Sequence, residues 1–415
     1  MTEHETQQCY DRIFVARQPI FTAQMNIWGY ELLFRHGETQ AAVFTDGDQA
    51  TTQVIADGFA LGTRGINGKI KALINFPRNV LVGAAPYVLP ADRSVVEILE
   101  TVLPEDEVME ACRELKNQGY TLALDDFVGE PGFEPLCEIA DIVKVDILGK
   151  SPVEVLAIVK GLRGYKARLL AEKVENLDMF NVCKKLGFEL FQGYFFSKPE
   201  IVPGRKLSAS QTTKIKLLKE LNESEAELSR LVEIIQTDLS ISYRLLKYIN
   251  SARFSLRGKI ESIPRAVNML GRQNLRQWLQ VVILSDINST DKGQELLRIS
   301  VLRGRFLQLL AAVHPAPFHP DSMFVLGFFS VLDAILDQHM DQVLDEISLD
   351  PDIKGALIDP HGPNSAWLEL LKELDRGRWT DLEQKATQMS IPMNLIDSVA
   401  IEAAMWTDEV MGCAS

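Results

Sequence analysis

The first half of the chain alternates short apolar runs with longer amphipathic stretches. Eight apolar runs, rich in Val, Ile, Leu or Phe and bounded by polar or turn-forming residues, predict β-strands. They span residues 13–16, 30–34, 72–75, 95–99, 121–124, 142–145, 168–171 and 190–196. Several intervening segments, including residues 105–118 and 152–162, have the spacing of amphipathic helices. Gly119 and Gly187 stand where helix C-terminal caps are expected.

This alternation is typical of a (β/α)8 barrel, in which helices join parallel strands. The first two strands are an exception, because only a short turn within residues 21–27 joins them. A crossover between parallel strands needs about a dozen residues or more, so one strand of this pair should run antiparallel. The predicted fold is α/β, a modified TIM-type (β/α)8 barrel with one antiparallel strand.

The pattern changes near Pro203 and Gly204. Beyond them strand-like runs nearly vanish, and apolar residues recur at helical spacing. Ser262-Ile-Pro264 predicts the start of a helix, and Gly271 predicts a stop. We therefore expect two domains, a barrel over residues 10–203 followed by an all-α helical domain over residues 204–408.

The composition excludes some functions without selecting one. Of 415 residues, 46% are hydrophobic and 24% are charged, as in an ordinary globular protein. The formal net charge of −14 argues against a nucleic-acid partner, which needs a basic face. Apolar runs are too short to span a membrane, so no membrane partner is expected. Five scattered cysteines without a CxxC pair, and a polar N-terminus, predict a cytoplasmic protein with reduced thiols.

Polar side chains lie at or near the ends of nearly all predicted strands. The set is Glu31, Asn75, Glu97, Asp125, Asp126, Lys144, Asp146, Glu172 and Gln192. In such barrels the carboxyl ends of the strands converge at one rim. Carboxylates and a carboxamide are hard oxygen ligands, which suit Mg²⁺ or Mn²⁺ better than zinc.

Spacing alone leaves three interpretations of this set open. Two cations bridged by Asp125 and Asp126 would stabilise an in-line phosphoryl displacement, with Lys144 orienting the water or offsetting phosphate charge. Glycosidases also place two carboxylates on a barrel rim. Acidic residues at strand ends can also be merely solvated, or can cap the following helix.

Eight segments of the first half carry a resemblance to a known family. In chain order they are Gln18-Pro-Ile20, Glu31-Leu-Leu-Phe-Arg35, Asn75, Glu97-Ile-Leu-Glu100, Asp125-Asp-Phe127, Lys144-Val-Asp146, Ala171-Glu-Lys-Val-Glu175 and Gln192-Gly-Tyr194. Together they resemble the EAL domain, a family that hydrolyses cyclic di-GMP to linear pGpG. The resemblance covers about residues 14–199.

The resemblance implies a role for each of these residues. A two-metal site for Mg²⁺ or Mn²⁺ would be formed by Glu31, Asn75, Glu97, Asp125, Asp126 and Glu172. Glu172 and Lys144 would be catalytic and prepare the attacking water. The substrate cyclic di-GMP would be bound by Gln18, Arg35, Asp146 and Gln192, and Glu100 and Glu175 would support loops. Because EAL enzymes commonly work as dimers, the resemblance leaves a homodimer open.

Departures from the family pattern surround the retained ligands. Val128 and Pro131 restrict the loop after Asp125-Asp-Phe127, which is usually small and flexible. Lys173 replaces a glycine and places a cation beside Glu172. Asn75 is followed by Phe-Pro, and Leu32 replaces the alanine of the family motif. Such neighbours of metal ligands commonly change affinity or activity about tenfold or more.

Segments of the second half, at residues 231–236, 238–252, 262–271 and 275–279, resemble an HDOD domain, over about residues 205–406. Its hydrolase relatives bind metals through a His-Asp pair and further histidines. This chain has no His-Asp dipeptide, and Phe329-Ser-Val-Leu-Asp333 stands at the corresponding place. His314 and His319 lie in a Pro-rich loop. The resemblance therefore implies a non-catalytic domain without a metal, which docks an unknown protein partner.

The two resemblances in this order are typical of bacterial EAL–HDOD signalling proteins. They imply a cyclic di-GMP signalling protein that hydrolyses the nucleotide to pGpG and so favours motility over biofilm. The alternative is a catalytically degenerate barrel that acts as a cyclic di-GMP sensor or as a protein-interaction scaffold.

Overall fold

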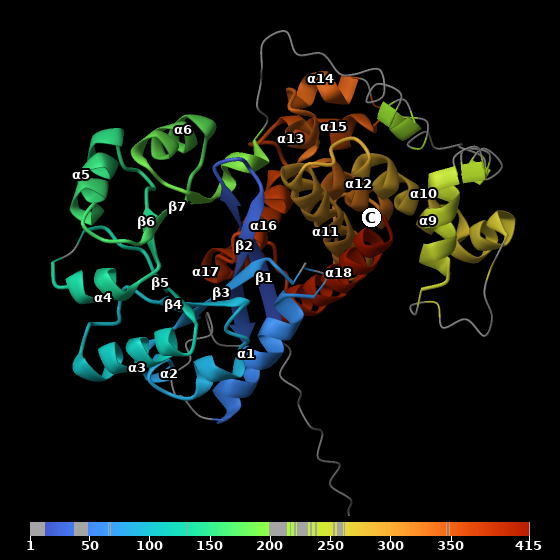
Figure 1. Ribbon diagram of the computed structural model, residues 1–415. Helices are drawn as coiled ribbons and strands as arrows, with labels where there is room; N and C mark the ends of the chain where they lie inside the picture. The colour runs from blue at the N-terminus through green and yellow to red at the C-terminus, as the bar shows by residue number, and fades with distance from the viewer. Residues whose placement is uncertain are drawn as a thin grey trace, which may run out of the picture. The chain divides into compact units, whose positions relative to one another are not determined.

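The computed structural model describes residues 13–36, 49–64, 66, 68–129, 131–198, 214–215, 217–219, 221, 231–232, 235–236, 239–251, 254, 260, 262–345, 347 and 349–414 (Figure 1). They belong to two compact units. The barrel unit falls within Met1–Val174, Asp178–Gly193 and Lys372–Ala400, and the helical unit within Glu175–Leu177, Tyr194–Leu371 and Ile401–Ser415. The domain limits predicted from the sequence, residues 10–203 and 204–408, stay a prediction.

Eight strands close into a barrel in chain order. The first strand pairs antiparallel with the second and the eighth, and the other neighbouring pairs are parallel. The expected modified (β/α)8 barrel with one antiparallel strand is therefore confirmed. The strands are β1 Ile13–Thr22, β2 Ile27–His36, β3 Lys71–Phe76, β4 Ser94–Ile98, β5 Thr121–Leu124, β6 Ile142–Asp146, β7 Arg168–Glu172 and β8 Leu190–Gln192.

A tight turn explains why β1 runs against its neighbours. Backbone hydrogen bonds from Thr22 N to Asn26 O and from Met25 N to Thr22 O, both 2.9 Å, close the turn between β1 and β2. Pairing across this hairpin carries both strands beyond the predicted runs. In contrast, β8 ends earlier than predicted, because Gly193 adopts a φ of 140° and the 3₁₀ helix η2 (Tyr194–Ser197) follows.

The connecting helices of the barrel begin and end where the sequence predicts caps. The helix α5 starts with a reciprocal cap, in which Ser151 Oγ accepts from Glu154 N and the Glu154 carboxylate accepts from Ser151 N. Gly119 and Gly187, with φ of 87° and 100°, follow α3 and α6. The elements are α1 Gln49–Gly62, α2 Arg78–Leu81, η1 Ala85–Val88, α3 Asp106–Asn117, α4 Glu134–Ile139, α5 Pro152–Leu162 and α6 Leu177–Leu186.

An apolar layer fills the barrel interior and supports the rim above it. It consists of Ile20, Leu73, Val95, Ala123, Ile142, Leu170 and Leu190, with Trp28 packed against it. All of these except partly buried Trp28 are at most 1% exposed. Because side chains on a strand alternate between faces, the residues two positions further along also point into the barrel. That spacing places the next inward layer at the carboxyl ends of the strands.

Every regular element described after η2 is a helix, as predicted. The start predicted at Ser262 is the N-cap of α10, and Gly271 interrupts this helix with a φ of 75°. The helices are α9 Leu239–Ile249, α10 Ile263–Ser285, α11 Asp291–Val313, α12 Pro320–Phe329, α13 Leu332–Leu336, α14 Met340–Asp345, α15 Pro351–Ile358, α16 Ser365–Asp375, α17 Trp379–Gln388 and α18 Met393–Ala414.

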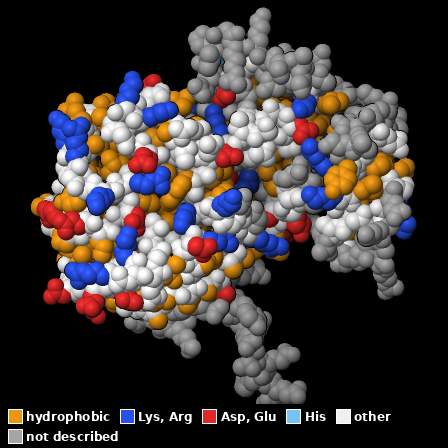
Figure 2. All heavy atoms as spheres, viewed as in Figure 1, with side chains coloured by type: hydrophobic (Ala, Val, Ile, Leu, Met, Phe, Trp, Pro, Cys, Tyr) orange, Lys and Arg blue, Asp and Glu red, His pale blue; other side chains and the backbone are white. Residues whose placement is uncertain are grey.

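Charged side chains are intermixed on the face of the barrel unit drawn in Figure 2, where Lys and Arg alternate with Asp and Glu. A helix that could cross a membrane, being both long and apolar enough, does not occur among the described residues.

Candidate active site

The inward layer at the barrel rim is polar. Two residues beyond the apolar layer lie Asn75, Glu97, Asp125, Lys144, Glu172 and Gln192, in order from β3 to β8. Glu31 joins them from β2, and Gln18 from β1 pairs in register with Glu31. Barrel closure therefore brings together most of the residues that the sequence predicted for the site.

Lys144 lies at the centre of this group and is 1% exposed. Its Nζ is 2.8 Å from Asp125 Oδ1, 2.8 Å from Glu172 Oε1 and 3.4 Å from Glu31 Oε2. It also forms an ion pair with Glu97 Oε1. Four carboxylates thus surround one ammonium group, which leaves a formal excess of negative charge in a buried place.

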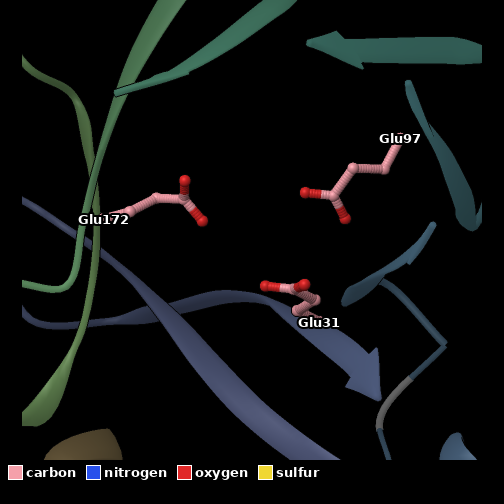
Figure 3. Close-up of side chains that lie close together, drawn as sticks. All are labelled: Glu31, Glu97 and Glu172. Atoms are coloured by element: carbon pink, nitrogen blue, oxygen red, sulfur yellow. The ribbon is translucent and has the colours of Figure 1, made fainter. Parts of the chain in front are cut away.

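Two groups of carboxylates have a spacing that could hold a metal ion. Oxygens of Glu31, Glu97 and Glu172 lie within 4.8 Å of one another, and so do those of Asp125, Asp126 and Glu172. Figure 3 shows the first three carboxylates pointing toward a common space from separate strands.

Atoms without partners show that these residues fit a hard divalent cation. Asn75 Oδ1, Glu97 Oε2 and Glu172 Oε2 are buried and accept no hydrogen bond in the part of the chain that the structure describes. Buried oxygens are normally satisfied, and a hard cation such as Mg²⁺ or Mn²⁺ takes oxygen ligands of this kind.

The pKa shifts of three buried side chains also favour binding of a cation at this place. Burial, followed by repulsion from Glu31, raises the pKa of Glu97 well above its ordinary value. Burial also raises the pKa of Glu172 well above its ordinary value, although Lys144 opposes the shift. Burial lowers the pKa of Lys144, but the surrounding carboxylates, first Asp125, outweigh this and hold it well above its usual range. A bound cation would relieve the same repulsion.

Two carboxamides extend the site toward β1. Gln192 Nε2 donates to Glu31 Oε2 (2.7 Å) and to Gln18 Oε1 (2.8 Å). Gln18 Nε2 in turn donates to the backbone carbonyl of Arg376, at the end of α16. The next residue, Gly377, is close to Leu33 of β2, since a Cβ there would lie 2.4 Å from Leu33 Cδ1. Sequence reasoning missed the Arg376 contact, because a backbone carbonyl carries no signature in residue type.

Lys173 has partners that the sequence did not indicate. Its Nζ is 2.7 Å from Asp146 Oδ2, and it is 3.0 and 3.2 Å from the two oxygens of Asp126. The sequence placed this lysine beside Glu172 but not in contact with these aspartates. Asp126 and Asp146 therefore lie at the rim facing an ammonium group.

Other predicted residues lie apart from the cluster. Glu100 and Glu175 are exposed, on loops that follow β4 and β7. Val128, in the altered loop, is 40% exposed. Arg35 belongs to β2, but its side chain lies outside the described part of the structure.

The helical unit has a different polar interior. Asp333 of α13 is largely buried, and burial raises its pKa to about 6. Lys292 Nζ is 2.9 Å from Asp337 Oδ1. Exposed His319 caps α12, where its Nδ1 accepts from Asp321 N. Among the described residues, two clusters of three carboxylates have metal-ligand spacing, and both clusters belong to the barrel unit.

Two family models match the chain in succession. The EAL domain model matches residues 74–199, and the HDOD domain model matches residues 207–335. Two solved structures also align with the chain. An EAL domain protein from Listeria monocytogenes is 20% identical, with a TM-score of 0.37 over 45% of this chain and 87% of that chain. Klebsiella pneumoniae BlrP1, solved with manganese and cyclic di-GMP, is 21% identical, with a TM-score of 0.37 over 46% of this chain and 57% of that chain.

Two relatives align with nearly the whole of this chain. A Vibrio cholerae protein named cyclic di-GMP phosphodiesterase CdgJ is 36% identical over 401 residues, which are 96% of this chain and 93% of that protein. The uncharacterized protein YuxH of Bacillus subtilis is 34% identical over 388 residues, or 91% of this chain and 94% of that protein. The chain therefore belongs to the family of proteins in which an EAL domain is followed by an HDOD domain.

Proposed function

We propose that this protein is a cyclic di-GMP signalling enzyme, whose barrel hydrolyses cyclic di-GMP to pGpG with the help of divalent cations. One observation carries the proposal. Carboxylates from separate strands converge around Lys144 at the barrel rim, with buried oxygens that lack partners among the described residues. The family membership and the name of the Vibrio cholerae relative support the same activity.

The residues that would hold the cations are Glu31, Asn75, Glu97, Asp125, Asp126 and Glu172. When bound, Mg²⁺ or Mn²⁺ supplies Lewis-acid stabilisation of charge on the phosphoryl oxygens. The oxygen ligands suit either ion.

Glu172 and Lys144 are the proposed catalytic residues. Water attacks phosphorus, the bond from phosphorus to the ribose oxygen breaks, and the ring opens to pGpG as that oxygen takes up a proton from solvent. Glu172, whose pKa burial raises, accepts the proton of the attacking water. Lys144 places a buried positive charge beside Asp125 and Glu172, where it offsets charge that develops on the phosphoryl group.

Polar groups next to the carboxylates would bind the nucleotide. Gln18 and Gln192 form a chain of amides that leads from Glu31 toward β1. Arg35 and Asp146 are the further proposed binding residues, and Glu100 and Glu175 the proposed loop supports. We assign to the HDOD domain the docking of a protein partner, without a metal of its own.

The test is hydrolysis of cyclic di-GMP with Mn²⁺ or Mg²⁺, followed by chromatography of pGpG. Glu31→Gln keeps the size of the side chain but removes one ligand charge, and should lower turnover at least about a hundredfold. Glu189→Gln is the matched control, because Glu189 pairs with Arg168 at the surface. Equal rates for the two variants would contradict the assignment.

The contacts of Lys173 favour a second function, that of a cyclic di-GMP sensor. The lysine already occupies both oxygens of Asp126, one of the proposed ligands. Binding of the nucleotide by calorimetry without any pGpG formed, at millimolar Mn²⁺ or Mg²⁺, would select the sensor over the enzyme.

A further inference from the structure

The ion pairs of Lys173 form a bridge across the barrel rim. The ammonium group joins Asp126, which follows β5, to Asp146, which ends β6. The remaining oxygen of Asp146, Oδ1, accepts a hydrogen bond of 2.7 Å from Leu148 N. Both aspartates are therefore held in place by donors of this chain.

The backbone fixes the position of Lys173. On one side, Ile147 N donates to Glu172 O (3.3 Å), and on the other, Val174 N donates to Gln192 O (3.0 Å). Lys173 and Asp126 both have positive φ, 55° and 41°. This conformation is uncommon for residues other than glycine, and here it occurs at both partners of one ion pair.

The bridge overlaps with one of the two candidate metal groups. Asp126 belongs to the group formed with Asp125 and Glu172. Since Lys173 Nζ lies within 3.2 Å of both Asp126 oxygens, a cation bound to either oxygen would lie within roughly 5 Å of the ammonium. Like charges at this separation repel each other, and solvent screens this repulsion only in part, because Glu172, one of the two other residues of the group, is buried.

The two candidate metal groups differ in how much of their negative charge a lysine offsets. Lys144 faces four carboxylates, so negative charge remains to attract a divalent cation to Glu31, Glu97 and Glu172. Lys173 faces two carboxylates. The positive charge of Lys173 therefore offsets a larger share of the negative charge at its end of the rim.

We propose that Lys173 is a positioning residue that acts as a built-in counter-cation for Asp126 and Asp146, and so weakens a second divalent cation at Asp125, Asp126 and Glu172. This inference rests on the proposed function, because it concerns the same metal site. It predicts unequal affinities, with one tight cation at the Glu31 end and one weak cation at the Lys173 end.

The experiment is a titration of the full-length protein with Mn²⁺ alone, followed by calorimetry and by electron paramagnetic resonance of free Mn²⁺. Wild-type protein should bind a second Mn²⁺ about tenfold or more weaker than the first. Lys173→Met, which keeps the length of the side chain, should tighten the second Mn²⁺ about tenfold. Lys173→Arg keeps the charge and should retain the wild-type pattern.

Lys116→Met is the matched control, because it removes a lysine that pairs with Asp141 elsewhere on the barrel. Equal Mn²⁺ affinities in wild type, Lys173→Met and Lys116→Met would overturn the inference, and so would a Lys173→Arg variant that behaves like Lys173→Met. Absence of any Mn²⁺ binding would overturn it together with the metal dependence of the proposed function. Normal Mn²⁺ binding without pGpG formation would overturn the phosphodiesterase alone.

Discussion

The barrel rim and the interior of the helical unit both bury charged side chains, but they balance them differently. At the rim, four carboxylates share Lys144. In the helical unit, Lys292 lies 2.9 Å from Asp337, and Glu295 lies 2.7 Å from Arg298. These opposite charges lie side by side, without an accumulation of one sign.

The difference reflects what each interior does. A buried ion pair satisfies its own charges, although it adds little net stability. A cluster with excess negative charge destabilises the protein until a cation binds, and it is retained where binding is the function. The excess negative charge at the rim would attract cations, whereas the charges of the two pairs in the helical unit already balance each other.

The largest effect is expected from removing the ammonium group at the centre of the barrel rim. Lys144→Met leaves four buried carboxylates without their central cation, and should lower the unfolding free energy of the barrel by about 3–5 kcal/mol in the absence of divalent cations. Native-state hydrogen exchange of β4 to β7 would measure it. Lys292→Met in the helical unit should cost less, because it leaves one carboxylate, that of Asp337, without its partner and not four. Equal losses would remove the contrast between the two regions.

A second prediction concerns Asp333, an acid of the helical unit whose pKa is raised by burial. Burial raises the pKa of Asp333 from 3.8 to about 6 in the folded protein. Its contribution to stability is therefore present at low pH and is lost as pH rises from about 4 through 6. Asp333→Asn cannot ionise, and should stabilise the helical unit by about 2–3 kcal/mol at pH 8.

Hydrogen exchange of α11 to α13 at pH 8 and at pH 4 would measure this effect, which should fade toward pH 4. Asp345→Asn is the control, since Asp345 is 73% exposed. A gain that is independent of pH would refute the electrostatic explanation.

The smallest effect comes from adding charge to the rim without changing its shape. Gln192→Glu replaces a donor 2.7 Å from Glu31 by a carboxylate. Without divalent cations the barrel should lose about 1–2 kcal/mol, measured again by hydrogen exchange. Gln192→Leu loses the donors but adds no charge, and should cost less. An equal loss for both would show that hydrogen bonding, not charge, governs this position.

Much of the site followed from local sequence. Six of its residues lie two positions beyond apolar core residues on successive strands, as in Leu73 and Asn75 or Leu170 and Glu172. A period of two identifies residues on one face of a strand. The resemblance implies which polar residues belong to the site. Barrel closure brings Glu31, Glu97, Asp125 and Glu172 around Lys144, whereas Glu100 and Glu175 lie apart.

Other contacts did not follow from the sequence. Lys173 was expected beside Glu172, yet it bridges Asp126 and Asp146, because its positive φ turns the side chain away from the regular strand geometry. Nucleotide binding by Gln18 stays a prediction, and no sequence pattern indicates that its amide donates to Arg376 O, more than three hundred residues later in the chain.

The sequence by itself determined the strands, the antiparallel hairpin, the helical second half and the polar residues of the rim. These depend on periodicity, turn length and residue type, which act over a few neighbouring positions. Only the tertiary structure decided which carboxylates share Lys144, which oxygens lack a partner among the described residues, and where Lys173 points. Those outcomes depend on strand register, barrel closure and the pairing of charges that are far apart along the chain, and no local pattern encodes them.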